Sequence, residues 1–320
     1  LKSSYKVVNR RHIRVKVMQS IYAMHQNGSD NLEKEEKFLF YSIDAIQDLY
    51  LIMLSSLIEI CKKETVFLFF SSQKHLATKE ERNPNEKFIK NSIFQILAEN
   101  NSLSIALENR SINNWTLNDD YIILLLNAIK ESELYAKYMS NSVNTFEEDK
   151  EFIVDIFTDV IVPNEKLYEY LEDDKLTWID DIPLVNTHII KQLKAIKQGE
   201  DDNFRVPKLY KDNEDKAYVK DLFRKTVLNE TELAKEYVDK TPNWDSERIA
   251  EIDTIILKMA ICEFLKFPSI PVKVTLNEYL ELAKEYSTPK SSIFINGILD
   301  NLVKELEEKK RIVKIGRGLM

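Results

Sequence analysis

The sequence predicts an all-α protein, and three observations lead to that class. The 320 residues include only 5 glycines and 8 prolines, which leave few turns for a many-stranded β fold. Apolar residues recur at helical spacing through much of the chain. The 44% hydrophobic content is enough for a sizeable core in one large or two ordinary domains. We therefore expect an all-helical chain.

The first helix is expected to begin after Asn9 and to end at Asn27-Gly28. Asparagine is a favoured N-cap, and an Asn-Gly pair is a common C-terminal stop. One face of this helix carries an apolar stripe that predicts burial, formed by Ile13, Val17, Ile21 and Met24.

Basic side chains gather at the start of the same helix. Arg10 and Arg14 lie one turn apart, Arg11 lies beside them, and Lys16 follows. Residues 1–29 contain no acid, and a helix N-terminus adds a partial positive charge of its own. An ordinary solvated helix start is the alternative, but the pattern favours anion or phosphate binding.

The middle of the chain predicts a long apolar helix, an exposed connection and then repeated units. The helix spans roughly Glu33–Lys63, and the polar connection spans Ser71–Asn85. Three similar stretches follow at near-equal spacing, each beginning with an aromatic residue and ending on tryptophan: Phe88–Trp115, Phe152–Trp178 and Tyr218–Trp244. They indicate a degenerate repeat of helix pairs. The alternative is that helix–turn–helix segments resemble one another by chance.

The C-terminal part predicts three consecutive helices. Pro268 and Pro271 stop the first of them, and Thr275 with Glu278 reads as a capping box for the second. Ser291 or Ser292 is the expected cap of the third helix. Its apolar positions share one face, formed by Phe294, Ile298, Leu302 and Leu306.

Two stretches of this sequence resemble the NusB family of bacterial transcription antitermination factors. The C-terminal one reads IPVKVTLNEYLELAKEYS and then FINGILD. The N-terminal one, RRHIRVKVMQSIYA, has an arginine-rich start before Gln19 and Tyr22. The resemblance barely covers residues 30–210. We therefore expect this stretch to include a large insertion. The resemblance implies NusB-like N-terminal and C-terminal helical bundles, with extra inserted helix-pair units. We accordingly expect an N-terminal helical region at 1–210 that holds the basic first helix and the inserted units, a NusB-like C-terminal domain at 211–310 and a basic tail at 311–320.

The resemblance also implies a function. A NusB-like protein is expected to bind single-stranded boxA RNA together with NusE, the small-subunit ribosomal protein. It would thereby support transcription of ribosomal RNA operons by RNA polymerase, with other Nus factors as indirect partners. The expected RNA-binding residues are the basic ones of the first helix and four at the start of the last helix: Arg10, Arg11, Arg14, Lys16, Ser291, Ser292, Phe294 and Asn296.

We expect these two groups to lie near each other. The arginines would hold phosphates, and Phe294 would stack on an unpaired base. Simple burial of Phe294 is the alternative, because it also falls on the apolar stripe.

Composition limits the other possibilities. The chain has no glycine-rich phosphate loop, GxSxG, HExxH or CxxC motif, so we expect no enzyme, cofactor or metal site. No apolar run approaches the roughly 20 residues of a membrane span. Cys61 and Cys262 fall in apolar helical patterns that suit reduced thiols. We expect a cytoplasmic protein without membrane contact.

Charge is unevenly distributed along the chain. The net charge is −8, yet the two ends are basic and the middle is acidic. Such a protein is suited to a local grip on a short piece of nucleic acid. A second hypothesis, of another class, is an α-helical repeat scaffold for protein–protein interaction without RNA binding.

Overall fold

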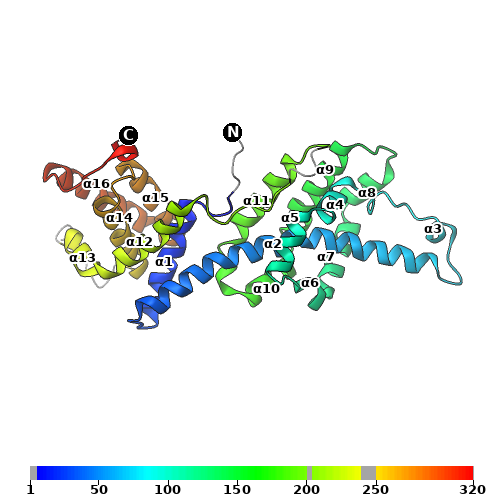
Figure 1. Cartoon of the computed structure of the whole chain (residues 1–320), viewed down its shortest axis with the longest axis horizontal. Helices are drawn as coiled ribbons and strands as arrows, with labels where there is room; N and C mark the ends of the chain where they lie inside the picture. The colour runs from blue at the N-terminus through cyan, green and yellow to red at the C-terminus, as the bar shows by residue number, and fades with distance from the viewer. Residues whose placement is uncertain (1–5, 200–203, 239–249, 320) are drawn as a thin grey trace. The chain divides into compact units, whose positions relative to one another are not determined.

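A computed structural model of the chain describes residues 6–199, 204–238 and 250–319 (Figure 1). Helices form its regular structure, and the one β-type pairing among the described residues is an isolated bridge between Lys6 and Lys208. The all-α prediction is confirmed. No described helix is both long enough and apolar enough to cross a bilayer.

The chain divides into two compact units. The terminal unit combines Val8–Ile43 with Tyr210–Met320, and the inserted unit combines Leu1–Val7 with Asp44–Leu209. The basic first helix thus belongs to the same unit as the C-terminal residues, whereas it was predicted to lie in an N-terminal region ending at 210.

The terminal unit is built around α14 (Glu251–Lys266). Helices from both ends of the chain pack against it: α1 (Arg10–Gln26), α12 (Asn213–Leu228), α13 (Glu230–Val238), α15 (Val272–Tyr286) and α16 (Pro289–Glu308). The unit also includes the first part of α2 (Leu32–Ser72) and a 3₁₀ turn, η5 (Gly316–Leu319). Residues 255–257 and 259–262 of α14 are all buried, as expected of a helix surrounded by others.

Helix α1 forms where the sequence predicts it. The side chain of Asn9 accepts a hydrogen bond from the His12 amide at 2.9 Å and caps the helix. The predicted stripe of Ile13, Val17, Ile21 and Met24 is buried. Local signals at both ends of this helix therefore fix its bounds.

Two predicted caps in the C-terminal helices are wrong. α15 begins directly after Pro271 with no side-chain cap, so Thr275 and Glu278 lie inside the helix and form no capping box. α16 begins at Pro289, and the hydroxyl of Thr288 accepts from the Ser291 amide at 3.2 Å. Ser291 and Ser292 therefore occupy the first turn. The predicted apolar face of this helix is buried at Phe294, Ile298, Leu302 and Leu306.

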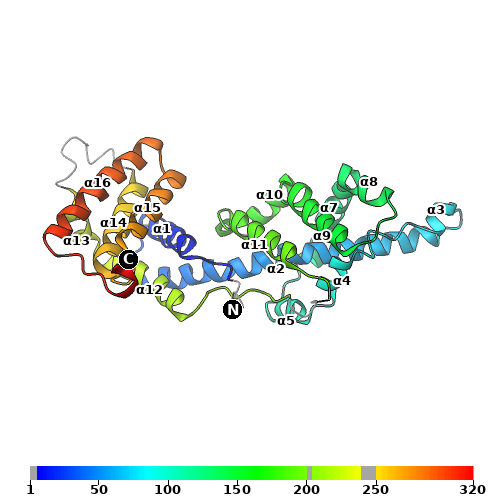
Figure 2. The same ribbon diagram turned by 90° about the horizontal axis from the view of Figure 1, so that it is seen from above.

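In the inserted unit, the remainder of α2 is flanked by shorter helices (Figure 2). Residues 49–54 of α2 are all buried, so this part of the helix is the core of the unit. The surrounding helices are α3 (Lys79–Arg82), α4 (Ser92–Ala98), α5 (Asn101–Asn109), α6 (Asn114–Leu117), α7 (Asp119–Glu131), α8 (Glu133–Ser140), α9 (Phe146–Ile156), α10 (Glu165–Asp174) and α11 (Ile182–Ala195). A π turn, η1 (Phe157–Ile161), follows α9, and a 3₁₀ turn, η2 (Leu176–Trp178), follows α10.

Two of the three repeat tryptophans occupy matching positions. The indole N–H of Trp115 donates to the Ile52 carbonyl at 2.9 Å, and that of Trp178 donates to the Ala45 carbonyl at 2.8 Å. Both acceptors lie on α2, about two turns apart.

The helices before these tryptophans are also capped alike. Asn100 accepts from the Leu103 amide, and Asn164 accepts from the Leu167 amide. Trp244 lies outside the described residues, so the three-unit repeat stays a prediction.

Candidate nucleic-acid interface

A groove of about 970 Å³ opens in the terminal unit beside the start of α1. Its walls come from α1, α12, the turn between α14 and α15, the first half of α15, and η5. Charged residues and an apolar strip share the lining, which consists of Asn9, Arg10, Arg11, Arg14, Glu214, Ala217, Tyr218, Asp221, Phe267, Ser269, Ile270, Pro271, Val274, Glu278 and Arg317.

A buried ion pair lies beneath this groove. The Arg14 guanidinium donates from Nε and Nη2 to the two carboxylate oxygens of Glu263, at 3.0 and 2.7 Å. Arg14 is 2% exposed and Glu263 is fully buried. Two parallel hydrogen bonds of this kind are the strong geometry for an arginine and a carboxylate. They fix the first turn of α1 against α14.

Three hydroxyl groups complete the coordination of the Glu263 carboxylate. Tyr218 donates at 2.6 Å, Thr275 at 2.8 Å and Tyr279 at 3.2 Å. Burial alone would raise the pKa of Glu263, but the Arg14 charge and these hydrogen bonds lower the pKa below its ordinary value. The carboxylate is therefore charged at neutral pH, and Thr275 serves this network instead of capping α15.

Arg10 and Arg11 lie at the rim of the groove. Arg10 Nε donates to Asp215 at 3.0 Å, and its guanidinium carbon lies 5.1 Å from the centre of the Tyr218 ring. Arg11 makes a two-pronged pair with Glu278, with both distances 3.0 Å. Their side chains are 36% and 46% exposed. Both guanidinium groups can thus be reached from solvent.

The basic cluster is less free than the sequence indicates. Acids absent from residues 1–29 reach it from α12, α14 and α15, as Asp215, Glu263 and Glu278. Arg14 and Lys16 are each 2% exposed, so neither presents its charge to the surface. Of the four predicted basic residues of α1, Arg10 and Arg11 are therefore the two that a phosphate in the groove can reach.

The expected residues of α16 lie apart from the groove lining. Ser291, Ser292 and Asn296 are half-buried, and Phe294 is 8% exposed in the apolar face of α16. None of these four residues lines the groove as the described residues define it. The burial of Phe294 matches the alternative weighed for it from the sequence.

Of the four arginines in the lining, Arg317 is the one that was not predicted from the sequence as a site residue. Arg317 reaches the groove from η5, with its side chain 78% exposed and 3.8 Å from Glu214. The signal was present, because the last residues form a basic run without acids. Nothing local in the sequence indicates that this run folds back beside α1.

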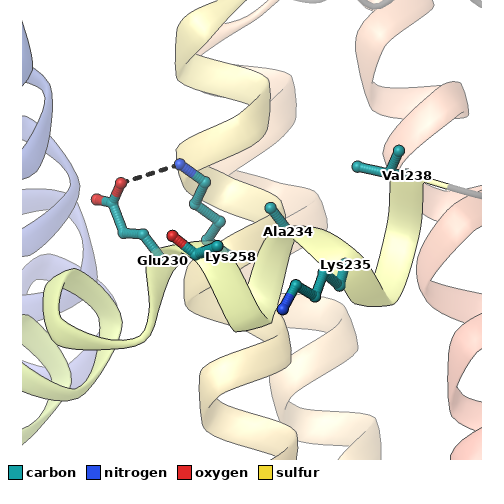
Figure 3. Close-up of a pocket in the computed structure, with 6 residues that line it drawn as sticks. Glu230, Ala234, Lys235, Val238 and Lys258 are labelled. Carbon is teal, nitrogen blue, oxygen red and sulfur yellow. Dashed lines mark hydrogen bonds and ion pairs between the residues drawn. The ribbon is translucent and has the colours of Figure 1, made fainter.

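A second, smaller cavity of about 490 Å³ lies between α13 and α14 (Figure 3). Lys258 and Lys235 face it, but Lys258 pairs with Glu230 at 3.1 Å and Lys235 with Glu232 at 2.8 Å. Its lysines are thus neutralised by neighbours, which makes it the weaker candidate for an anionic ligand.

The described residues contain no cluster of three or more histidine, cysteine or acidic side chains placed to hold a metal ion. Cys61 and Cys262 are free thiols, and burial raises the pKa of each to about 11. Neither thiol is activated, since the thiolate is disfavoured at neutral pH.

Comparisons with known proteins agree on one family. The model of the NusB family matches residues 185–304. A transcription antitermination protein NusB from Salinibacter ruber is 40% identical over 140 residues, which is 41% of this chain and 86% of that protein. No solved structure matches the chain.

Two further relatives carry the same name. The one from Chloroherpeton thalassium is 37% identical over 105 residues, covering 33% of this chain and 50% of that protein. The one from Natranaerobius thermophilus is 44% identical over 90 residues, covering 27% of this chain and 65% of that protein.

Proposed function

The chain belongs to the NusB family, and we propose on that premise that it acts in transcription antitermination by binding RNA in the groove beside α1. The finer part of the proposal is a boxA-type single-stranded RNA, bound jointly with NusE, during transcription of ribosomal RNA operons. RNA polymerase and other Nus factors would be indirect partners.

The observation that supports this function is that the three arginines of α1 differ in burial. Arg14 is buried and fixes α1 through Glu263, whereas Arg10 and Arg11 keep exposed guanidinium groups at the rim. An exposed ion pair is worth only about 0–1 kcal/mol. Arg11 can therefore exchange Glu278 for an RNA phosphate, which an arginine fork also binds in two-pronged fashion.

A small basic site on an acidic protein supports a binding partner. Sequence-independent affinity for nucleic acid grows with the number of phosphates that basic groups neutralise. Two rim arginines supply few such contacts, so the proposal needs additional contacts from a second protein. NusE fills that place in the proposed complex.

The test is RNA affinity of the full chain across a salt series, with and without NusE, on a boxA RNA and on a scrambled control. Changing both Arg10 and Arg11 to alanine should weaken binding and reduce the slope of log affinity against log salt by about 1.4, since a single-stranded phosphate contact contributes about 0.7. Arg14 should stay unchanged in this test, because its loss would unsettle the fold.

A matched control is available on the same unit. Arg311 makes a two-pronged pair with Glu236 at 2.8 Å and is 44% exposed, much like Arg11 with Glu278, but it lies outside the groove lining. Arg311→Ala should bind RNA as the parent does. Equal binding by the parent and the Arg10/Arg11 variant, with NusE present, would refute this site.

The scaffold hypothesis is not favoured. It explains the helical repeats of the inserted unit, but it leaves the match of residues 185–304 to the NusB family without a role. Protein binding that persists after loss of both rim arginines, with no RNA binding under any condition, is the result that would revive it.

A further inference from the structure

The basic C-terminal segment packs against the end of α14, beside the groove. We call its contact surface, the backbone carbonyls of Glu263, Phe267 and Pro268, the seat. We propose that residues 314–319 form one wall of the RNA site and that Arg317 is a phosphate contact of that site. This inference rests on the proposed function and adds a residue and a structural device that the family resemblance does not assign.

The seat is made from the backbone at the end of α14. The Ile315 amide donates to the Pro268 carbonyl at 3.0 Å. The Lys314 ammonium donates to the Glu263 and Phe267 carbonyls, at 3.3 and 3.0 Å. These carbonyls lie in the last turn of α14 and just after it, where a cation is stabilised by both hydrogen bonding and the helix dipole.

Gly318 permits the closest approach in this seat. A Cβ atom built on Gly318 would lie 2.1 Å from the Pro268 carbonyl oxygen, which is a backbone atom and cannot rotate away. Pro268 cannot withdraw easily, because the same oxygen accepts the Ile315 amide. Gly316 adds a second requirement, since its φ of 54° favours glycine. Both glycines thus serve the return of the segment to α14.

The seat delivers Arg317 to the groove as its most accessible arginine. Its side chain is 78% exposed, against 46% for Arg11, 36% for Arg10 and 2% for Arg14. Its ion-pair partner Glu214 is 3.8 Å away and is itself 69% exposed. Such a loose, solvated pair holds the guanidinium weakly, so a phosphate can replace Glu214 at little cost.

Glu263 connects the two basic ends of the chain. Its carboxylate holds Arg14 from α1, and its carbonyl holds Lys314 from the C-terminal segment. The N-terminal and C-terminal basic runs therefore meet at one residue of α14. A single rigid helix can in this way align arginines from both ends along the same RNA strand.

The experiment combines RNA binding with a probe of the seat that needs no RNA. Arg317→Ala and Gly318→Ala are compared with Arg311→Ala in the full chain, using the boxA RNA and NusE across a salt series. Trypsin cleavage after Lys314 and Arg317, followed by mass spectrometry, reports whether the segment is seated.

We expect Arg317→Ala to weaken RNA binding roughly threefold and to lower the salt slope by about 0.7, as for one lost phosphate contact. Arg317→Lys should restore most of the slope. Gly318→Ala should be cleaved faster and bind RNA as weakly as Arg317→Ala, and the double variant should be no weaker, because unseating the segment already removes Arg317. Arg311→Ala should match the parent in RNA binding.

The failures are distinguishable. Parental binding by Arg317→Ala, alongside weakened binding by the Arg10/Arg11 variant, overturns this inference and leaves the proposed function intact. Absence of RNA binding by the parent overturns both. Parental cleavage of Gly318→Ala overturns the seat, whatever the RNA result.

Discussion

Both units are helical, yet the interactions that join helices within each unit differ. The inserted unit contains 20 basic and 29 acidic residues, a balance of −9. The terminal unit contains 25 basic and 24 acidic residues, a balance of +1. In the inserted unit, neutral tryptophan N–H groups donate to backbone carbonyls of α2. In the terminal unit, the buried Arg14–Glu263 pair ties helices from the two ends of the chain.

In the terminal unit, buried charges hold helices in place, whereas exposed charges remain available to a ligand. A buried ion pair is a poor source of net stability but is costly to break. It therefore suits an element whose position must be exact, such as the start of α1. The acidic balance of the inserted unit disfavours nucleic acid there, which agrees with the proposed RNA site in the terminal unit.

The largest expected effect comes from breaking the buried pair on one side. Glu263→Gln keeps the shape of the side chain but removes the buried counter-ion of Arg14 and leaves it only Glu278, at 3.6 Å. Removing one partner of such a pair costs about 3–5 kcal/mol. Urea unfolding followed by circular dichroism measures the loss. A cost below about 1 kcal/mol would show that the network does not hold the terminal unit.

The fold of the terminal unit could be predicted where helix bounds depend on neighbouring residues. Asn9 and Asn27-Gly28 bound α1 in the sequence as they do in the structure, because caps act on neighbouring amides. The Thr275–Glu278 capping box failed because both side chains take tertiary partners, Glu263 and Arg11. A pattern that is correct locally was overruled by packing.

The groove beside α1 could likewise be predicted only in part, because its contacts join residues far apart in the sequence. The arginines of α1 stood out in the sequence, but the acid that pairs with Arg14 is 249 positions away, and no spacing rule connects the two. Arg317 was visible as part of a basic run and invisible as part of a groove. Single-sequence patterns identify which charges exist, whereas the fold decides which of them are neutralised.

The pH dependence of stability tests whether Glu263 is charged in the folded protein. Its pKa in the folded state is lowered below the unfolded value, so its contribution to stability is full above about pH 4.3 and is lost as the pH falls through the folded-state pKa. Glu263→Gln lacks this titration. The difference in free energy of unfolding between parent and variant should therefore decrease as the pH is lowered from about 5 to 3. Calorimetry at each pH measures this difference. A difference that stays constant over this range would contradict the assigned charge state.

A smaller effect is expected in the inserted unit. Trp178→Phe removes the N–H donor to the Ala45 carbonyl and part of the buried indole, at a cost of about 1–3 kcal/mol. Trp115→Phe should cost a similar amount, because its N–H donates to the equivalent carbonyl one heptad further along α2. Urea unfolding of both variants tests whether the two helix pairs are held alike. A large difference between them would argue against the repeat.

The smallest stability effect should come from Arg11, a residue of the proposed RNA site. Arg11→Ala removes a two-pronged but exposed pair with Glu278, and exposed pairs contribute only about 0–1 kcal/mol. Arg311→Ala removes an equally exposed pair with Glu236, so the two variants should unfold at nearly the same urea concentration.

Their RNA affinities should nevertheless separate, because Arg11 lines the groove and Arg311 does not. Measuring both properties on the same two proteins tests whether binding can be lost without loss of folding. If Arg11→Ala is destabilised by more than about 2 kcal/mol, Arg11 acts as part of the buried network, and Arg10 with Arg317 would have to supply the phosphate contacts. If both variants fold alike and bind alike, the groove is not where the RNA lies.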